Sequence, residues 1–131
     1  MNSISQSLTL FWFRRDLRFS DNHGFFEALK NSAPVLPVFV FDLNILSELK
    51  NKKDKRINFI YEALSALDKK FRTYGSGLFV MHDEPLKAIQ YLCQKFAIKQ
   101  VFTNTDYEPY ALNRDQEIAN WLKTINIPFL S

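Results

Sequence analysis

The stretch LTLFWFRRDLRFSDN, residues 8–22, changes from apolar to charged within a single step. Residues 8–13 are almost entirely apolar and lack polar alternation, which is typical of a strand that is covered on both faces of a sheet. The residues that follow are dense in charge, namely Arg14, Arg15, Asp16, Arg18 and Asp21. We therefore expect this strand to be buried along its length and to end at a polar rim.

Four more apolar runs, residues 33–41, 77–81, 99–104 and 127–131, resemble the first, and helical patterns lie between them. Asp21 and Asn22 are candidate N-caps for the helix in HGFFEALKN, and Asp54 precedes a longer one. Apolar residues recur at helical spacing in the later segments and are predicted to pack in the core: Ile57, Ile60, Tyr61, Leu64, Leu67, Phe71; Leu86, Ile89, Leu92, Phe96; Leu112, Ile118, Trp121, Leu122, Ile125.

This alternation of strands and helices predicts an α/β fold: a doubly wound, Rossmann-like, five-stranded parallel sheet of order 3-2-1-4-5 with helices on both faces. We expect one domain over residues 1–131. Residues 42–55 are predicted to carry a short helix and a basic tip. Their lysines fit a solvated loop better than a phosphate site, although both interpretations stay open.

The net charge, the cysteine count and the length of the apolar runs argue against several classes of protein. A net charge of +3 and a pI near 9.0 describe a mildly basic chain without the footprint of a nucleic-acid-binding protein. The single cysteine, Cys93, cannot form an internal disulfide, and it lies on a predicted helix face as an inert thiol. The chain opens without a signal-peptide pattern, and no apolar run is long enough to span a bilayer. We expect a cytoplasmic protein.

Polar residues follow three of the predicted strands. Arg14 and its neighbours follow the first, Asp42 the second, and Asn104, Asp106 and Glu108 the fourth. Ligands of doubly wound sheets bind beyond the carboxyl ends of the strands, so these residues are expected to line the mouth of a cleft. The alternative is that Arg14, Arg15 and Arg18 pair with Asp16, Asp21 and one another's neighbours and only orient the loop. The chain has no glycine-rich phosphate loop, and His23 and His82 lack partners at metal-ligand spacing.

Four motifs resemble the DNA photolyase/cryptochrome family. LFWFRRDLRFSDN is similar to the N-terminal W-x-R-x-D-L-R-x-x-D-N signature, and VFVFDLNIL to the second strand with its continuation. DKRINFI is similar to the start of the family's long helix, and TNTDYEPYALNRD to N-x-D-x-E-P-Y-x-x-x-R-D. The four motifs occur in the family's order over residues 8–115.

The resemblance implies the N-terminal antenna domain of a deoxyribodipyrimidine photolyase. A C-terminal helical domain that binds FAD and damaged DNA would then lie outside this chain, and the 131 residues would not be catalytic alone. The parent would reverse cyclobutane pyrimidine dimers in light, as a carbon-carbon lyase. Residues matching the antenna site are Arg14, Arg15, Phe41, Asp42, Arg56, Phe59, Asp106 and Glu108. Structural motif residues are Asp16, Arg18, Asp21, Asn22, Arg114 and Asp115.

The antenna pigment implied by the resemblance is a deazaflavin or flavin rather than a folate, because Tyr110-Ala111 stands where one kind of folate-binding member has Asn-Glu. An empty site is also allowed. Two alternatives stay open. One lies within the same family, a cryptochrome blue-light sensor, and the other outside it, a free-standing nucleotide-binding module of flavodoxin or stress-protein type. No membrane partner is expected. Separated from the helical domain, the fragment is expected to self-associate, because apolar surface would be uncovered.

Overall fold

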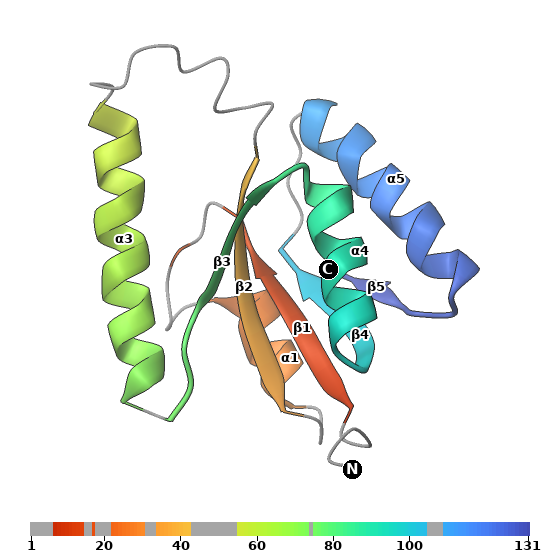
Figure 1. The fold of residues 1–131 in the computed structure, drawn as a ribbon, viewed down its shortest axis with the longest axis horizontal. Coiled ribbons are helices and arrows are strands. Elements are labelled where there is room, and N and C mark those ends of the chain that lie inside the picture. The colour runs from red at the N-terminus through yellow and green to blue at the C-terminus, as the bar shows by residue number, and fades with distance from the viewer. Residues whose placement is uncertain are drawn as a thin grey trace.

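The computed structural model describes residues 7–14, 17, 22–30, 34–42, 55–73, 75–104 and 109–131, apart from the side chains of residues 23 and 55–57. Within these residues five strands form one parallel sheet of order β3-β2-β1-β4-β5 (Figure 1). The strands are β1 (Leu8–Phe13), β2 (Val35–Asp42), β3 (Phe79–Asp83), β4 (Ile98–Thr103) and β5 (Phe129–Leu130). The predicted fold class and strand order are therefore confirmed. The observed bounds of β2 to β5 differ from the predicted ones by one or two residues.

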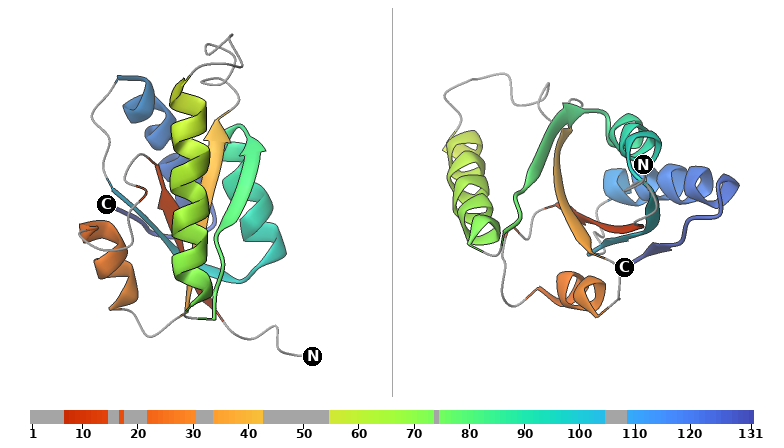
Figure 2. Two further views of the ribbon diagram at one scale, coloured as in Figure 1. Left: turned by 90° about the vertical axis from the view of Figure 1, so that its left-hand side faces the viewer. Right: turned by 60° about the horizontal axis from the view of Figure 1, so that its bottom comes forward.

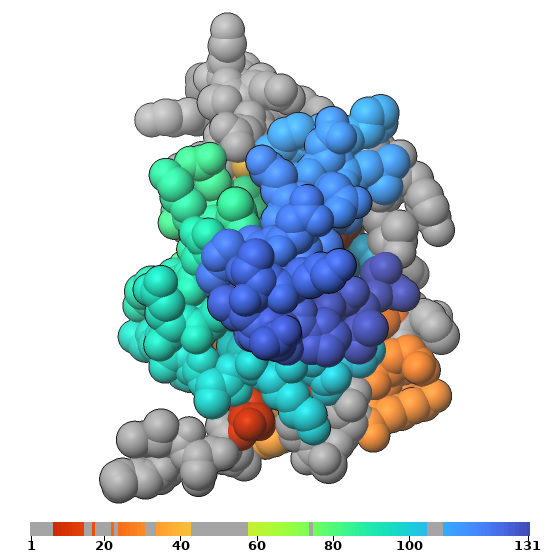
Figure 3. All heavy atoms as spheres, turned by 90° about the vertical axis from the view of Figure 1, so that its right-hand side faces the viewer, coloured from red at the N-terminus to blue at the C-terminus, as the bar shows by residue number. Residues whose placement is uncertain are grey.

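Within the described ranges, four helices cover the two faces of this sheet. They are α1 (His23–Leu29), α3 (Lys55–Arg72), α4 (Pro85–Lys95) and α5 (Pro109–Thr124). Helices α1 and α3 lie on one face, and α4 and α5 lie on the other (Figure 2). Figure 3 shows α5 crossing its face of the molecule with α4 beside it. None of the helices in the described ranges is long and apolar enough to cross a membrane.

The apolar run of β1 is buried on both faces, as predicted. Leu10 and Trp12 point into the core shared with α4 and α5, while Phe11 and Phe13 point into the core shared with α1 and α3. The second core is built mainly of phenylalanine rings. Phe13 meets the ring of Phe11 edge-on at 4.7 Å between centroids, in the geometry that aromatic pairs favour. Many of the chain's phenylalanine side chains thus lie in one of the two cores, the one beneath α1 and α3.

Among the side chains that the structure describes, three residues of the predicted core stripes lie at the surface. Tyr61 on α3 and Leu112 and Ile125, on and after α5, are each between two-fifths and one-half exposed. The prediction was wrong there because a helix on a sheet buries only part of its circumference, so residues at the border of an apolar stripe meet water. The predicted helix in segment 42–55 falls largely on residues 43–54, outside the described residues.

Cys93 lies partly buried beside the core of α4 and α5. Burial raises the pKa of its thiol to about 11, because the thiolate would lose hydration there. This agrees with an inert thiol, since the thiolate is the reactive form of cysteine.

Candidate functional site

The carboxyl ends of β1, β2 and β4 form the edge at which a doubly wound sheet binds ligands. Phe39 of β2 is level with Phe13, the last residue of β1, and β2 continues to Asp42. Arg14 follows β1 directly, and Asn104 follows β4. Three groups of side chains gather along this edge.

The first group, which we call the charged cluster, consists of Arg14, Asp42, Arg114 and Asp115. Arg14 Nη2 donates to Asp115 Oδ1 at 2.6 Å, and Arg114 Nη1 donates to Asp42 Oδ2 at 3.4 Å. Arg114 Nε lies 3.7 Å from the same Asp115 oxygen that Arg14 contacts. All four side chains are largely buried. Two cations and two anions are thus paired with one another under α5.

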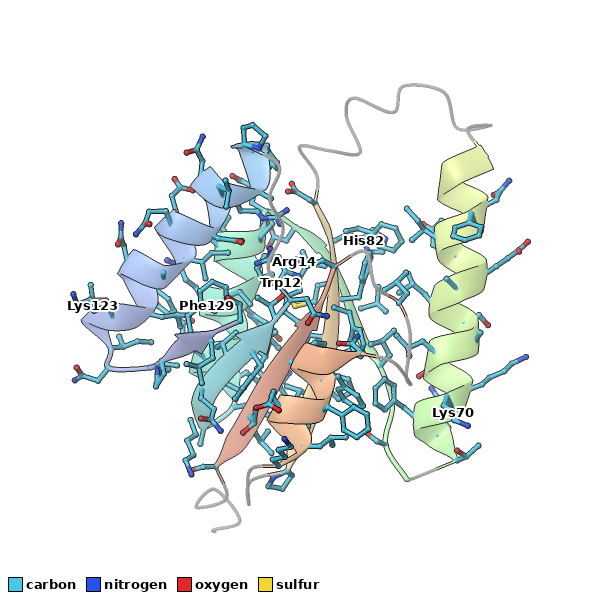
Figure 4. All side chains as sticks on the ribbon, turned by 180° about the vertical axis from the view of Figure 1, so that it is seen from behind. Trp12, Arg14, Lys70, His82, Lys123 and Phe129 are labelled. Atoms are coloured by element: carbon cyan, nitrogen blue, oxygen red, sulfur yellow. The ribbon has the colours of Figure 1, made fainter. Side chains whose placement is uncertain are left out.

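Two aromatic residues complete the surroundings of the charged cluster. Tyr110, one helical turn before Arg114, donates its hydroxyl to Asp42 Oδ2 at 2.8 Å. The guanidinium carbons of Arg14 and Arg114 lie 4.4 and 4.9 Å from the centre of the buried Trp12 ring. Both distances are within the range of a cation–π contact. Figure 4 shows Trp12 and Arg14 at the carboxyl end of β1. The cluster therefore ties the first turns of α5 to the ends of β1 and β2.

The second group, the aromatic stack, lies on the opposite face of the sheet. His82 on β3 is the cross-strand neighbour of Phe41 on β2, and their rings stack at 4.7 Å with an angle of 13° between planes. Tyr61 of α3 lies on the same Phe41 ring at 5.1 Å. Phe41 is buried, whereas Tyr61 and His82 are exposed. Two of the stack's three residues, Tyr61 and His82, are therefore open to solvent at the edge next to α3.

The third group, the asparagine pair, joins the end of β4 to the start of α1. Asn22 is the N-cap of α1, and its Oδ1 accepts from the amide of Phe25 at 3.1 Å. The same oxygen accepts from Asn104 Nδ2 at 2.7 Å, and Asn104 Oδ1 accepts from the amide of Gly24 at 2.9 Å. Of the two predicted caps, Asn22 is confirmed, while Asp21 lies outside the described residues.

The predicted antenna residues fall on both faces of the sheet. Arg14 and Asp42 are brought together in the charged cluster with Arg114 and Asp115, so Arg14 is ion-paired with a residue of α5, while the loop aspartates named in the ion-pairing alternative lie outside the described residues. Phe41 points to the other face, into the core beneath α3. Phe59 lies on α3 with 72% of its surface exposed. The remaining predicted site and motif residues are outside the described side chains: Arg15, Asp16, Arg18, Asp21, Arg56, Asp106 and Glu108.

Trp12, Tyr61, His82 and Tyr110 were not predicted as site residues. Tyr110 had a local signal, because it stands four residues before Arg114 and such pairs share a helix face. The contact between Tyr61 and Phe41 depends on how α3 lies against β2, which no local pattern reveals. Among the described residues, no three His, Cys, Asp or Glu side chains are grouped as a metal site would need.

The fold is that of a Rossmann-like α/β domain, and polar and aromatic side chains gather at the carboxyl ends of its strands. The chain belongs to the DNA photolyase family, whose model matches residues 9–131. It is 36% identical over 118 residues to the deoxyribodipyrimidine photo-lyase of a Synechococcus species, covering 90% of this chain and 24% of the relative. It is 29% identical over 126 residues to the cryptochrome-1 of Anopheles gambiae, covering 90% and 23%.

A solved structure shares the fold at a TM-score of 0.79. It is an archaeal photolyase from Sulfolobus tokodaii, 29% identical, and the match covers 94% of this chain and 28% of that one. That protein was crystallised with two FAD molecules, with the implication of a novel light-harvesting cofactor. The chain thus spans about a quarter of the length of these relatives.

Proposed function

We propose that this chain is the antenna-pigment-binding domain of a deoxyribodipyrimidine photolyase. The observation that carries the proposal is the family match over residues 9–131, supported by the photolyase relatives. In the whole protein, a helical domain would hold FAD and the damaged DNA. The family match favours this function over a free-standing module of flavodoxin type.

The pigment we propose is of flavin or deazaflavin type, bound at the carboxyl edge on the side of α3. The Sulfolobus photolyase with its two FAD molecules supports a flavin in this role. Flat rings bind well to apolar aromatic surfaces, and the aromatic stack offers such rings beside α3, the helix that also carries the exposed Phe59. A bound flavin would supply light absorption, and the protein would supply position and orientation.

Two of the six charged residues of the predicted antenna site, Arg14 and Asp42, have a different role in this proposal. Arg14 and Asp42 are engaged with α5, on the other face from Phe41. We propose that they hold the edge in shape, and that Arg15, Arg56, Asp106 and Glu108 supply the polar contacts to the pigment. Each of these four can be substituted singly in the binding assay described next.

The pigment proposal is tested by titrating riboflavin with the 131-residue chain and following quenching of flavin fluorescence. Phe59→Ala should weaken binding at least tenfold, since the ring is exposed and contributes little to the fold. Phe26→Ala on α1 is the matched control, because Phe26 is likewise exposed, at 57% against 72% for Phe59, but lies outside the proposed site. Equal affinities for both variants would reject this surface as the site.

The photolyase proposal is tested on the longer protein that contains this chain. The protein is photoreduced, mixed with DNA that carries thymine dimers, and illuminated with blue light against a dark control. Light-dependent recovery of thymine absorbance would support the photolyase. A cryptochrome is the second candidate, favoured by the similarity to the Anopheles protein. Bound, reducible flavin without repair would favour the cryptochrome.

The proposed partners are the helical FAD domain and, through it, DNA. We also propose that the 131-residue chain self-associates when it is separate. Exposed apolar side chains on α1 and α3, such as Phe26, Leu29 and Phe59, provide surface for this. Sedimentation velocity at increasing concentration measures it, and a constant monomer would reject it.

A further inference from the structure

In Rossmann-like domains, the first turn of the helix after β1 is the position that binds a nucleotide phosphate. Its free amides and the helix dipole attract the anion, and glycine residues let the phosphate approach the backbone. In this chain the corresponding helix is α1, and the structure gives hydrogen-bond partners for three amides of its first turn, those of Gly24, Phe25 and Phe26. These contacts show what occupies the phosphate position.

The amides of Gly24, Phe25 and Phe26 are each bonded within the protein. Gly24 donates to Asn104 Oδ1 at 2.9 Å, and Phe25 donates to Asn22 Oδ1 at 3.1 Å. Phe26 donates to the carbonyl oxygen of Asn22 at 3.0 Å. A phosphate at this turn would have to displace side-chain oxygens that already accept from the Gly24 and Phe25 amides. Exchanging one acceptor for another yields little net binding.

The orientation of Asn104 is fixed by its two partners. Its Oδ1 faces a donor, the amide of Gly24, and its Nδ2 faces an acceptor, Asn22 Oδ1, at 2.7 Å. Asn22 is buried and is itself held as the N-cap of α1. The amides of Gly24 and Phe25 and both polar atoms of the Asn104 side chain therefore have complementary partners, and Asn104 and Asn22 together close these two amides to a ligand.

Gly24 is the residue that admits this arrangement. A Cβ atom at position 24 would lie 2.4 Å from Asn104 Oδ1 and 3.1 Å from Cε1 of Phe11. Glycine thus permits the close approach that a phosphate needs in other Rossmann-like domains, but here the approaching group is the side-chain amide of Asn104.

We propose that Asn104 is a specificity-determining residue of the carboxyl edge. Its side-chain oxygen occupies the position of a ligand phosphate at α1. A pigment is therefore recognised by its ring system, and any phosphate it carries lies away from α1. This inference rests on the proposed pigment-binding function for its ligand class, whereas the closure of α1 to phosphate does not depend on it.

The closure is tested directly with pyrophosphate and the 15N-labelled chain. The chain contains only three glycines, so the Gly24 amide is readily assigned in an NMR spectrum. Its resonance should stay in place as pyrophosphate is added to millimolar concentration. A saturable shift of the Gly24 and Phe25 amides would overturn the inference.

The ligand preference is tested with riboflavin and FMN, which share one ring system and differ by a phosphate. When each flavin is added to saturation, both should shift the Gly24 amide equally. A shift of this amide with FMN alone would place the phosphate at α1 and overturn the inference. Binding of neither flavin would reject the proposed function, while the pyrophosphate titration would still decide the closure.

Asn104→Ala tests the role of the residue itself. Without Oδ1, hydrogen exchange of the Gly24 amide should be at least tenfold faster than in the unsubstituted chain. Asn120→Ala is the matched control, because Asn120 lies on α5 and its described bond is to Gln116. Unchanged protection of Gly24 in Asn104→Ala would overturn the assignment. Should that variant not fold, the two titrations of the unsubstituted chain remain decisive.

Discussion

Asp115→Asn should destabilise the domain far more than its small change in size suggests. Asp115 accepts from Arg14 at 2.6 Å, and the two side chains are only 18% and 7% exposed. Removing one partner of a buried ion pair costs about 3–5 kcal/mol, because it leaves the other charge without compensation. The introduced amide keeps an oxygen for Arg14, and Asp42 still lies near Arg114, so we expect the lower value, about 3 kcal/mol.

This free energy corresponds to a large shift in melting temperature. The unfolding entropy of globular proteins is about 2.1 cal/mol/K per residue, or about 275 cal/mol/K for 131 residues. A loss of about 3 kcal/mol should therefore lower Tm by about 11 °C. Thermal unfolding followed by circular dichroism measures this shift.

The matched control is Asp68→Asn. Asp68 accepts from Arg72 Nε at 2.9 Å, a similar geometry, but the Arg72 side chain is 70% exposed. Exposed pairs contribute about 0–1 kcal/mol, so Tm should fall by less than about 4 °C. The reasoning also predicts that Arg14→Met/Asp115→Leu is more stable than Asp115→Asn alone, since no isolated charge remains. Equal losses for the two Asp→Asn variants would refute it.

Gly24→Ala should destabilise the domain by about 1–3 kcal/mol, because the added Cβ overlaps Asn104 Oδ1 and crowds Phe11. Urea titration measures the free energy of unfolding of this variant and of Gly77→Ala, whose Cβ would be in ordinary contact at 3.6 Å. Gly77→Ala should lose much less stability, and the reverse order would contradict the packing. Cys93 should react with iodoacetamide at pH 8 about 100-fold more slowly in the folded chain than in urea, because its pKa is raised from 9.0 to about 11. Equal rates would show that the thiol is not shielded.

The fold could be predicted because its signals are local. The run in β1 is apolar at both alternating sets of positions, and this pattern indicates a strand between two layers of helices. Asn22 could be predicted as a cap for the same reason, since a cap acts on an amide three residues away. Such features depend on short segments of the chain.

The site could be predicted only in outline. Arg14 and Asp42 were expected at the rim, but their partners on α5 are 101 and 72 residues away, and no local pattern joins them. Period-two alternation separates Phe41 from Asp42, and this places one in each face of the sheet. Which helix residue meets each of them depends on how α3 and α5 pack, and packing of this kind is determined by the whole core.

The position of β1 has a consequence for how the chain folds during synthesis. β1 precedes the other described strands in the sequence and lies at the centre of the sheet, and Leu8 pairs with Ile98, 90 residues later. At a synthesis rate of about 5–20 residues per second, β1 waits about 5–18 s for β4. During that interval, one side of a strand rich in phenylalanine and tryptophan lacks its neighbour. We expect a ribosome-associated chaperone to bind the nascent chain during this interval. Slower translation of residues 43–97 would lengthen the time for which the apolar strand β1 is exposed.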